Sequence, residues 1–179
     1  MSQAQPRPIL YLVVCAAPPV QRIDELIELL HQAGWRICVI PTPHAASWID
    51  GQELTQQTGY PVRYDHRLPG DPDSLPRADA IAVVPATFNT INKWAAGIND
   101  TFALGILNEA IGLKSPVIVA PYAKPSLAAH PAFSVSLEKL NGWGVNVLSN
   151  EAIRVTDVDD KSAPRFSWRP VIEAVTRVL

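Results

Sequence analysis

The 179-residue sequence has only two cysteines, few aromatic residues and no block of charge of one sign. Cys15 and Cys38 each fall inside or at the end of an apolar run, so we interpret both as reduced, buried residues rather than a disulfide. No spacing of cysteine and histidine suits a zinc site. The formal net charge of −2, with no basic block, argues against nucleic acid or an anionic membrane as the main partner.

The sequence also lacks a hydrophobic run long enough to cross a membrane, and Met1–Pro8 is polar and contains prolines, unlike a signal peptide. We therefore expect a cytoplasmic protein. Hydrophobic residues make up 47% and charged residues 18%, which is typical of a globular chain. We expect one domain over residues 1–179, with 1–7 and roughly 156–166 irregular.

Glycine is missing from the first strand-to-helix turn, Cys15–Pro19. A dinucleotide-binding Rossmann domain needs glycines there, so that the backbone can approach a pyrophosphate. A P-loop is absent as well. These two absences set aside NAD(P) and ATP as ligands.

What the sequence does contain is a regular alternation of apolar runs and segments of helical periodicity. The predicted strands are Ile9–Cys15, Arg36–Ile40, a short one around Val62, Ala80–Val84, Ser115–Ala120 and Val145–Leu148. The predicted helices are about Val20–Ala33 (ended by Gly34), Ala45–Gln57, a helix from about Asn89, Thr101–Ile111 (ended by Gly112), Pro131–Asn141 and Arg169–Leu179. This order predicts a three-layer α/β fold with a doubly wound parallel sheet of about six strands, Rossmann- or flavodoxin-like.

The most informative stretch is Ala82–Asp100. Its apolar start predicts a central strand, and Pro85, which has no N–H to donate, predicts the end of that strand. Thr87, Asn89 and Thr90 follow, and such small side chains can cap a helix and also reach a ligand. In an open α/β sheet this turn lies at the carboxyl edge, where ligands bind.

This turn resembles a known motif. It reads Pro85-Ala86-Thr87-Phe88-Asn89-Thr90 and is similar to the Pro-Ala-Ser-Ala-Asn-Thr motif of the homo-oligomeric flavin-containing cysteine decarboxylases. That family of FMN proteins includes phosphopantothenoylcysteine decarboxylase and the lantibiotic peptidyl-cysteine decarboxylases. The likeness continues at Ala96-Gly97-Ile98-Asn99-Asp100, similar to the family's Gly-Ile-Ala-Asp turn, and extends from about Ile9 to Leu148. It implies non-covalent FMN and a homo-oligomer, a trimer or a multiple of one.

The resemblance implies an FMN phosphate near Ala17 and Thr42 and a flavin ring near the Pro85–Thr90 turn. Ala16 and Ala17 stand where the family has Gly and Ser, and Thr42 matches the family's phosphate-binding Ser or Thr. A hydroxyl beside a helix N-terminus suits an anion, although a plain helix cap explains Thr42 equally well. The implied cofactor-binding residues are Ala16, Ala17, Thr42, Pro85, Ala86, Thr87, Asn89 and Thr90.

Two departures from the family pattern concern catalysis. A gapless alignment puts Asp71 at the place of the family's catalytic His, with His66 nearby in sequence. The family's Pro-x-Met-Asn-x-x-Met-Trp segment, whose Asn holds the substrate carboxylate, corresponds to Pro121–Ala128, and Lys124 replaces that Asn. An ammonium can also hold an anion.

His130 directly precedes Pro131 at a predicted helix start, where the helix dipole disfavours a charged imidazole. A neutral imidazole there can serve as a base. The alternative is that Lys124 is a solvated loop residue and His130 a packed helix-start residue. The candidate catalytic residues are His130, Lys124 and Asp71.

Three functions remain open. One is an FMN enzyme with altered chemistry, oxidoreductase-like, acting on a small or peptidyl substrate. Another is the family's decarboxylation itself, with His66 or His130 in place of the family His. The third is a non-catalytic, FMN-binding regulatory subunit. Apolar and aromatic residues around the motif, Phe88, Trp94 and Phe102, are consistent with a helix shared between subunits.

Overall fold

Five parallel strands form the sheet of the computed structural model, which describes residues 6–66, 68–155 and 166–178. They are β1 (Ile9–Val14), β2 (Arg36–Pro41), β3 (Ala80–Ala86), β4 (Val117–Pro121) and β5 (Asn146–Val147). Their spatial order, β2-β1-β3-β4-β5, is the flavodoxin-like order, with its switch point between β1 and β3. The predicted doubly wound parallel fold is confirmed.

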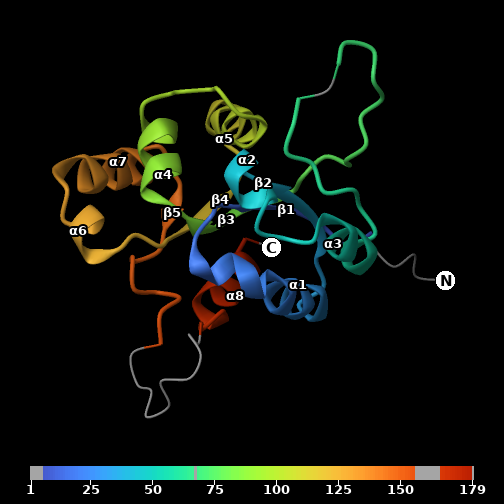
Figure 1. The fold of residues 1–179 in the computed structure, drawn as a ribbon, viewed down its shortest axis with the longest axis horizontal. Coiled ribbons are helices and arrows are strands. Elements are labelled where there is room, and N and C mark those ends of the chain that lie inside the picture. The colour runs from blue at the N-terminus through green and yellow to red at the C-terminus, as the bar shows by residue number, and fades with distance from the viewer. Residues whose placement is uncertain (1–5, 67, 156–165, 179) are drawn as a thin grey trace.

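Helices cover both faces of the sheet (Figure 1). They are the 3-10 helix η1 (Pro18–Arg22) and the α-helices α1 (Ile23–Gln32), α2 (Pro43–Ala46), α3 (Gly51–Thr58), α4 (Phe88–Ala95), α5 (Phe102–Leu113), α6 (Pro125–Ala128), α7 (Pro131–Gly142) and α8 (Arg169–Thr176). Alternate residues of β1 point to opposite faces: Leu10 and Leu12 pack in the core that includes α1 and α8, whereas Ile9 and Val13 pack in the core that includes α4, α5 and α7. Both faces are therefore buried, as the apolar runs indicate.

The sixth predicted strand, around Val62, is wrong. The Val62 amide donates to the Thr55 hydroxyl (3.3 Å). The neighbouring Arg63 amide makes one bond to the Val39 carbonyl of β2 (3.3 Å). A single bond does not build a ladder, so the segment stays irregular although it lies beside β2.

Pro85 does not end the central strand, and that prediction is wrong too. β3 continues to Ala86, with a shift of register against β4 between Val83 and Ala86. Pro85 lacks an N–H, but its carbonyl accepts from the Cys15 amide (3.1 Å) and the Ala86 carbonyl accepts from the Tyr122 amide (2.8 Å). Acceptors alone suffice to continue the strand.

Several helix boundaries differ from the predicted ones. The first helix begins with the 3-10 turn η1, and the predicted Ala45–Gln57 helix is split into α2 and α3 because Asp50 caps α3 by accepting from two amides at 3.0 Å. Gly34 ends its segment in the left-handed region as predicted (φ 94°). Gly112, however, lies inside α5, which ends at Leu113 and is capped by Lys114 in the left-handed region (φ 54°).

The segments predicted to be irregular, 1–7 and about 156–166, fall almost entirely outside the described residues. Among the helices that the structure describes, none combines the length and the apolar composition that crossing a bilayer requires. Within the same residues, His, Cys, Asp and Glu side chains do not gather in threes or more as a metal site would need.

Candidate functional site

Two adjoining pockets lie at the carboxyl edge of the sheet, where the turns after the strands meet. The threonine pocket has a volume of about 460 Å³ and is lined by, among others, Thr42, His44, Thr90, Lys93, Thr101 and Leu104. The aromatic pocket has a volume of about 610 Å³ and is lined by, among others, Phe88, Tyr122, Lys124, Pro125, Leu127 and Arg154. The two pockets share Ala16, Thr87 and Asn89. One extended ligand can therefore contact both.

Three threonines of the threonine pocket are helix N-caps. The Thr42 hydroxyl accepts from an amide of α2 (3.3 Å), Thr87 from an amide of α4 (3.4 Å) and Thr101 from an amide of α5 (3.2 Å). The first amides of a helix have no partner within it and carry partial positive charge. Because several helix starts border one cavity, the threonine pocket suits an anionic group such as a phosphate.

A buried chain of polar groups lies under the threonine pocket. The Thr90 hydroxyl oxygen accepts from the Cys15 thiol and from the Thr87 hydroxyl, both at 3.3 Å. Thr90 is only 5% exposed, and burial raises the pKa of the Cys15 thiol above its ordinary value. The thiol is therefore neutral, and its bond to Thr90 joins the turn after β1 to α4. Asn89, by contrast, is exposed and lines both pockets.

Two further polar residues of α4 are paired. The Lys93 ammonium, in the lining of the threonine pocket, lies 2.6 Å from the Asp100 carboxylate. This hydrogen bond, together with the charge of Lys93, lowers the pKa of the Asp100 carboxyl. Asn92, which a simple capped helix leaves unexplained, accepts from the Ser136 hydroxyl (2.6 Å) and so joins α4 to α7.

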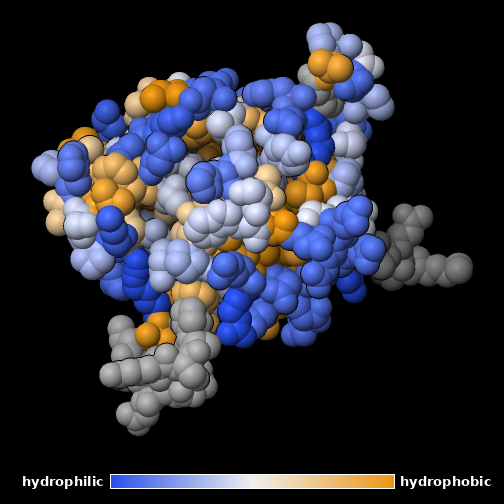
Figure 2. All heavy atoms as spheres, viewed as in Figure 1, coloured by the Kyte–Doolittle hydropathy of each residue, from blue (hydrophilic) through white to orange (hydrophobic). Residues whose placement is uncertain are grey.

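The aromatic pocket combines ring faces with two cations. Phe88 stacks on Phe133 with ring centroids 5.8 Å apart. Tyr122 forms another part of the wall, with Lys124 and Arg154 beside it. In Figure 2, hydrophobic patches lie among hydrophilic residues over α6 and α7, whereas α1 and α3 present a mostly hydrophilic surface. Two residues that line the aromatic pocket, Pro125 and Leu127, belong to α6.

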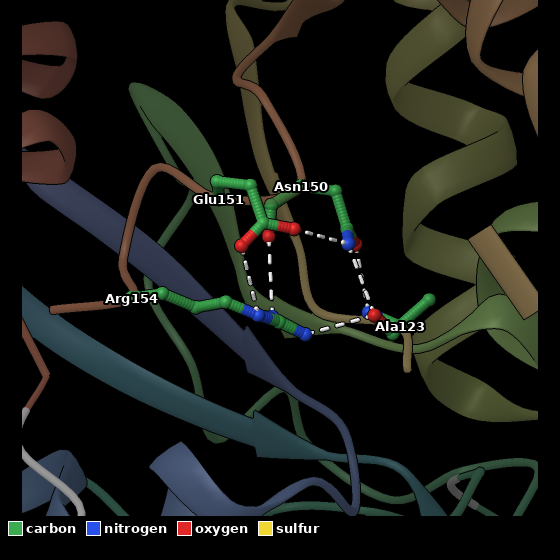
Figure 3. Close-up of polar contacts among 4 residues, drawn as sticks. All are labelled: Ala123, Asn150, Glu151 and Arg154. Atoms are coloured by element: carbon green, nitrogen blue, oxygen red, sulfur yellow. Dashed lines mark hydrogen bonds and ion pairs between the residues drawn. The ribbon is translucent and has the colours of Figure 1, made fainter. Parts of the chain in front are cut away.

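Sequence reasoning missed Thr101, which it identified only as a helix start, and it missed Arg154. The Arg154 guanidinium lies over the Tyr122 ring at 3.8 Å and donates to the Ala123 carbonyl (2.8 Å), as Figure 3 shows for the polar contacts. The only sequence signal was an arginine in a charged stretch, 151–167, and nothing in the local spacing connects it to a turn 31 residues earlier.

The structure brings most of the predicted cofactor residues together. Ala16, Thr42, Thr87, Asn89 and Thr90 line the threonine pocket, and Ala17 lines the aromatic pocket. Pro85 and Ala86 line neither pocket: both are buried in β3, and their carbonyls already accept bonds from other strands or turns.

Of the three predicted catalytic residues, only Lys124 lines one of the two pockets. Lys124 lines the aromatic pocket, but Asp71 lies in the loop between α3 and β3, where its carboxylate accepts from the Leu68 amide (3.1 Å). His66, in the same loop, packs edge-on against Phe102 of α5 with ring centroids 5.8 Å apart. Neither Asp71 nor His66 lines either of the two pockets.

His130 caps α7. Its Nδ1 accepts from the Ala132 amide (3.1 Å), and its ring meets Phe88 edge-on at 5.7 Å. A neutral imidazole in this position therefore carries its proton on Nε2 and has no free lone pair to accept another. Acting as a base would require it to give up the cap.

Comparison with known proteins gives a consistent family. The family model described as "Flavoprotein" matches residues 2–179. The coenzyme A biosynthesis bifunctional protein CoaBC of Thermococcus kodakarensis is 32% identical over 107 residues, which are 59% of this chain and 25% of that protein. CoaBC of Mycobacterium tuberculosis is 29% identical over 140 residues, 75% of this chain and 32% of that protein. The chain thus spans about a quarter to a third of the length of these curated relatives.

A shorter match is the dihydromethanopterin reductase (acceptor) of Methanosarcina mazei, 42% identical over 48 residues, 27% of this chain and 20% of that protein. Among solved structures, the FMN-dependent cysteine decarboxylase TvaF from thioviridamide biosynthesis is 26% identical, with a TM-score of 0.71 over 80% of this chain and 90% of that chain. SpaF, an FMN-dependent cysteine decarboxylase, has a TM-score of 0.73 over 98% of this chain and 99% of its own, at 17% identity, and this likeness concerns the fold.

Proposed function

The chain belongs to the flavoprotein family, and we propose that it binds FMN non-covalently at the carboxyl edge of its sheet and works as a flavoenzyme on a small or peptidyl substrate. The observation that carries the proposal is the pair of adjoining pockets with Thr87 and Asn89 between them. The threonine pocket suits the phosphate of FMN, the boundary formed by Thr87 and Asn89 suits its ring, and the rest of the aromatic pocket is open to a substrate beside the ring.

The residues present fit this cofactor. Ala16 and Ala17 have no side chain beyond Cβ, so the turn after β1 allows close approach to a phosphate. The Thr42 hydroxyl accepts a bond from its helix, and its own proton is available for a phosphate oxygen. Thr87 and Asn89 offer a hydroxyl and an amide on the side shared with the aromatic pocket.

When bound, FMN supplies an acceptor for electrons or hydride. The chain's own part is to bind and orient: the helix starts hold the phosphate, and Thr87 and Asn89 face the flavin ring. The aromatic pocket excludes water from the substrate, and Lys124 holds the acidic group of the substrate. Asp71 and His66 line neither pocket, and the Nδ1 lone pair of His130 accepts a hydrogen bond from the α7 backbone. We therefore favour chemistry that needs no histidine base. The match to a dihydromethanopterin reductase over 48 residues supports this oxidoreductase reading.

Decarboxylation of a cysteine-type substrate is the second candidate function. It is favoured by the likeness to TvaF, which at 26% identity covers 90% of that chain. It needs a residue to replace the family His, and His66 is the nearest candidate in the loop before β3.

We also propose that the chain forms a homo-oligomer, a trimer or a multiple of one. Ile98, just after α4, is 41% exposed, and Phe88 and Phe102 remain half-buried. Trp94, by contrast, is completely buried within its own chain and gives no support to a shared interface. Measurement of the solution mass by light scattering tests the proposal, and a strict monomer at micromolar concentration contradicts it.

Flavin binding is tested by titrating the purified protein with FMN and following flavin fluorescence. Thr42→Ala should weaken FMN binding about tenfold, because a hydrogen bond to a charged group is lost, and Thr42→Ser should retain most of it. Riboflavin, which has no phosphate, should bind the wild type and Thr42→Ala equally. Protein that neither carries nor binds FMN contradicts the proposed function.

The two chemistries are separated by anaerobic mixing of the FMN-loaded protein with cysteine-terminated peptides and, in parallel, with reduced pterins. Bleaching of the flavin band without release of carbon dioxide supports the oxidoreductase. Carbon dioxide release that is lost in His66→Ala supports the decarboxylase.

A further inference from the structure

The turn after β4 is fixed by a segment much later in the chain. Asn150 bonds both backbone groups of Ala123: its side-chain oxygen accepts from the Ala123 amide (2.8 Å) and its nitrogen donates to the Ala123 carbonyl (2.9 Å). Arg154 adds a second bond to that carbonyl (2.8 Å). Figure 3 shows these bonds meeting at Ala123. Because Ala123 is only 3% exposed, they fix the backbone that carries its neighbours Tyr122 and Lys124.

The Arg154 guanidinium has contacts on several sides. It stacks on Tyr122 at 3.8 Å, donates from one terminal nitrogen to Ala123, and has its Nε 3.3 Å from the Glu151 carboxylate. The other terminal nitrogen reaches the Asn150 carbonyl at 3.4 Å. A guanidinium has five N–H groups, and these contacts use one on each of its three nitrogens, so two have no partner among the described residues. Arg154 also lines the aromatic pocket.

The charged side chains that line the aromatic pocket are all positive. Lys124 and Arg154 line it, and its lining contains no acidic side chain. Glu151 pairs with Arg154 from outside the lining, with its own side chain 64% exposed, so water screens much of its charge. The rest of the lining combines ring and aliphatic groups, among them Phe88, Tyr122 and Leu127, with two neutral polar side chains, Thr87 and Asn89. Such a pocket matches a molecule with a flat apolar body and one acidic group.

We propose that Arg154 determines the ligand specificity of the aromatic pocket: it fixes the Tyr122–Lys124 turn and, with Lys124, selects ligands that carry a carboxylate on a planar apolar group. A guanidinium that is held flat by a ring and by backbone carbonyls is pre-organised to bind a carboxylate, so little side-chain entropy is lost on binding. The inference rests on the proposed function, since it names the substrate class of the same sheet edge.

The test compares two probes of the same shape, benzoate and benzamide, by calorimetric titration of the FMN-loaded protein. The wild type should prefer benzoate. Arg154→Ala and Lys124→Ala should each lower the ratio of benzoate to benzamide affinity about tenfold, because each removes a cation that faces the carboxylate. Glu151→Gln should raise this ratio, because it removes the opposing charge while its amide oxygen can still accept from Asn150.

A purely structural role of Arg154 predicts another pattern. Arg154→Ala would then weaken both probes equally and leave the ratio unchanged, and that result overturns the proposal, as does a wild type that binds neither probe. If Arg154→Ala does not fold, Arg154→Lys provides the test, because it keeps the charge but loses the planar guanidinium. The ratio of benzoate to benzamide affinity should then fall about two- to threefold, and an unchanged ratio contradicts the proposal.

Flavin absorbance is recorded in the same samples and separates the two proposals. Protein without flavin that still prefers benzoate contradicts the proposed function but supports the role of Arg154. Yellow protein that does not discriminate between the probes contradicts only the role of Arg154.

Discussion

The two pockets at the carboxyl edge are built in different ways. The threonine pocket is assembled from local contacts, because Thr42, Thr87 and Thr101 each cap the helix that they begin, three residues away. The aromatic pocket depends on bonds from Asn150 and Arg154 to a turn 27 and 31 residues earlier. The threonine pocket is therefore shaped by contacts between neighbouring residues, whereas the aromatic pocket is complete only when distant segments have packed together.

The pockets also differ in how they meet an anion. In the threonine pocket the one lysine of the lining is neutralised by Asp100 at 2.6 Å, so positive potential comes mainly from backbone amides. In the aromatic pocket it comes from side chains, Lys124 and Arg154. The first arrangement suits the phosphate of the proposed cofactor, and the second suits the carboxylate of the proposed ligand.

Of the substitutions considered, Trp94→Ala should have the largest effect on stability, and it should disrupt the threonine pocket. Trp94 is completely buried, and its indole donates to the Leu107 carbonyl (3.2 Å), which joins α4 to α5, the two helices that carry Thr87 and Thr101. The free energy of unfolding should fall by about 3–5 kcal/mol, through the cavity and the lost bond. Urea denaturation measures it, and FMN affinity should fall in the same variant.

Trp35 is the matched control. It is equally buried, in the core on the other face of the sheet, but its indole nitrogen has no partner among the described residues. Trp94→Phe should therefore cost about 1–2 kcal/mol more than Trp35→Phe, since only the former loses a buried hydrogen bond, whereas the latter removes a buried N–H that has no partner among the described residues. Equal costs would contradict the role given to the Trp94 bond.

Asn150→Ala should break the aromatic pocket selectively. It leaves the buried Ala123 amide without a partner, so the free energy of unfolding should fall by about 1–3 kcal/mol. Binding of benzoate should weaken while FMN affinity stays near that of the wild type, because the threonine pocket has no contact with Asn150 in its lining. Asn150→Asp keeps the acceptor for the amide, and its cost should be smaller.

The sequence could predict the threonine pocket because its parts are local. An apolar run followed by Thr or Asn predicts a strand end and a helix cap, and parallel strands bring these turns to one edge. The same logic failed at Pro85, where carbonyl acceptors alone continue the strand, and around Val62, where no ladder partner exists beyond one bond to β2.

Arg154 and Ser136 show what local patterns cannot predict. Their partners, Ala123 and Asn92, lie 31 and 44 residues away, and each pairing exists only after helices and turns have packed. The shape of the loop before β3 is a similar case, since packing of His66 on Phe102 has no periodic signal.

Thr87→Ala should lower the stability moderately, and it tests the contribution of a local helix cap to the threonine pocket. The variant loses the cap of α4 and the bond from the Thr87 hydroxyl to Thr90. The free energy of unfolding should fall by about 1 kcal/mol, the usual cost of a lost cap. Thr87→Ser retains the hydroxyl and should recover most of it in the same thermal melts. A Ser variant as unstable as the Ala variant would show that the methyl group, not the cap, matters.

A change of pH should have the smallest effect near neutrality. Burial raises the pKa of Cys38 from its ordinary 9.0 to about 12 and that of Tyr11 from 10.0 to about 12, and burial also raises the pKa of Cys15. All three groups are then protonated in the folded protein at neutral pH, as they are in the unfolded chain, so stability should not change between about pH 6 and 8 on their account. The Cys15 thiol under the threonine pocket should also resist iodoacetamide until the protein unfolds.

Above about pH 9, the direction in which stability changes follows from how many protons the folded and unfolded states bind. The unfolded chain releases its thiol proton there while the folded chain holds it, so the unfolded state binds fewer protons and stability should fall as pH rises toward about 12. Urea midpoints measured at intervals from about pH 8 to 10.5 record this slope. Cys38→Ala removes one of the groups and should flatten the slope, although its midpoint at pH 8 is lower because a buried sulfur is lost. A slope that Cys38→Ala leaves unchanged would place the titration in Tyr11 or Cys15 and contradict the shift at Cys38.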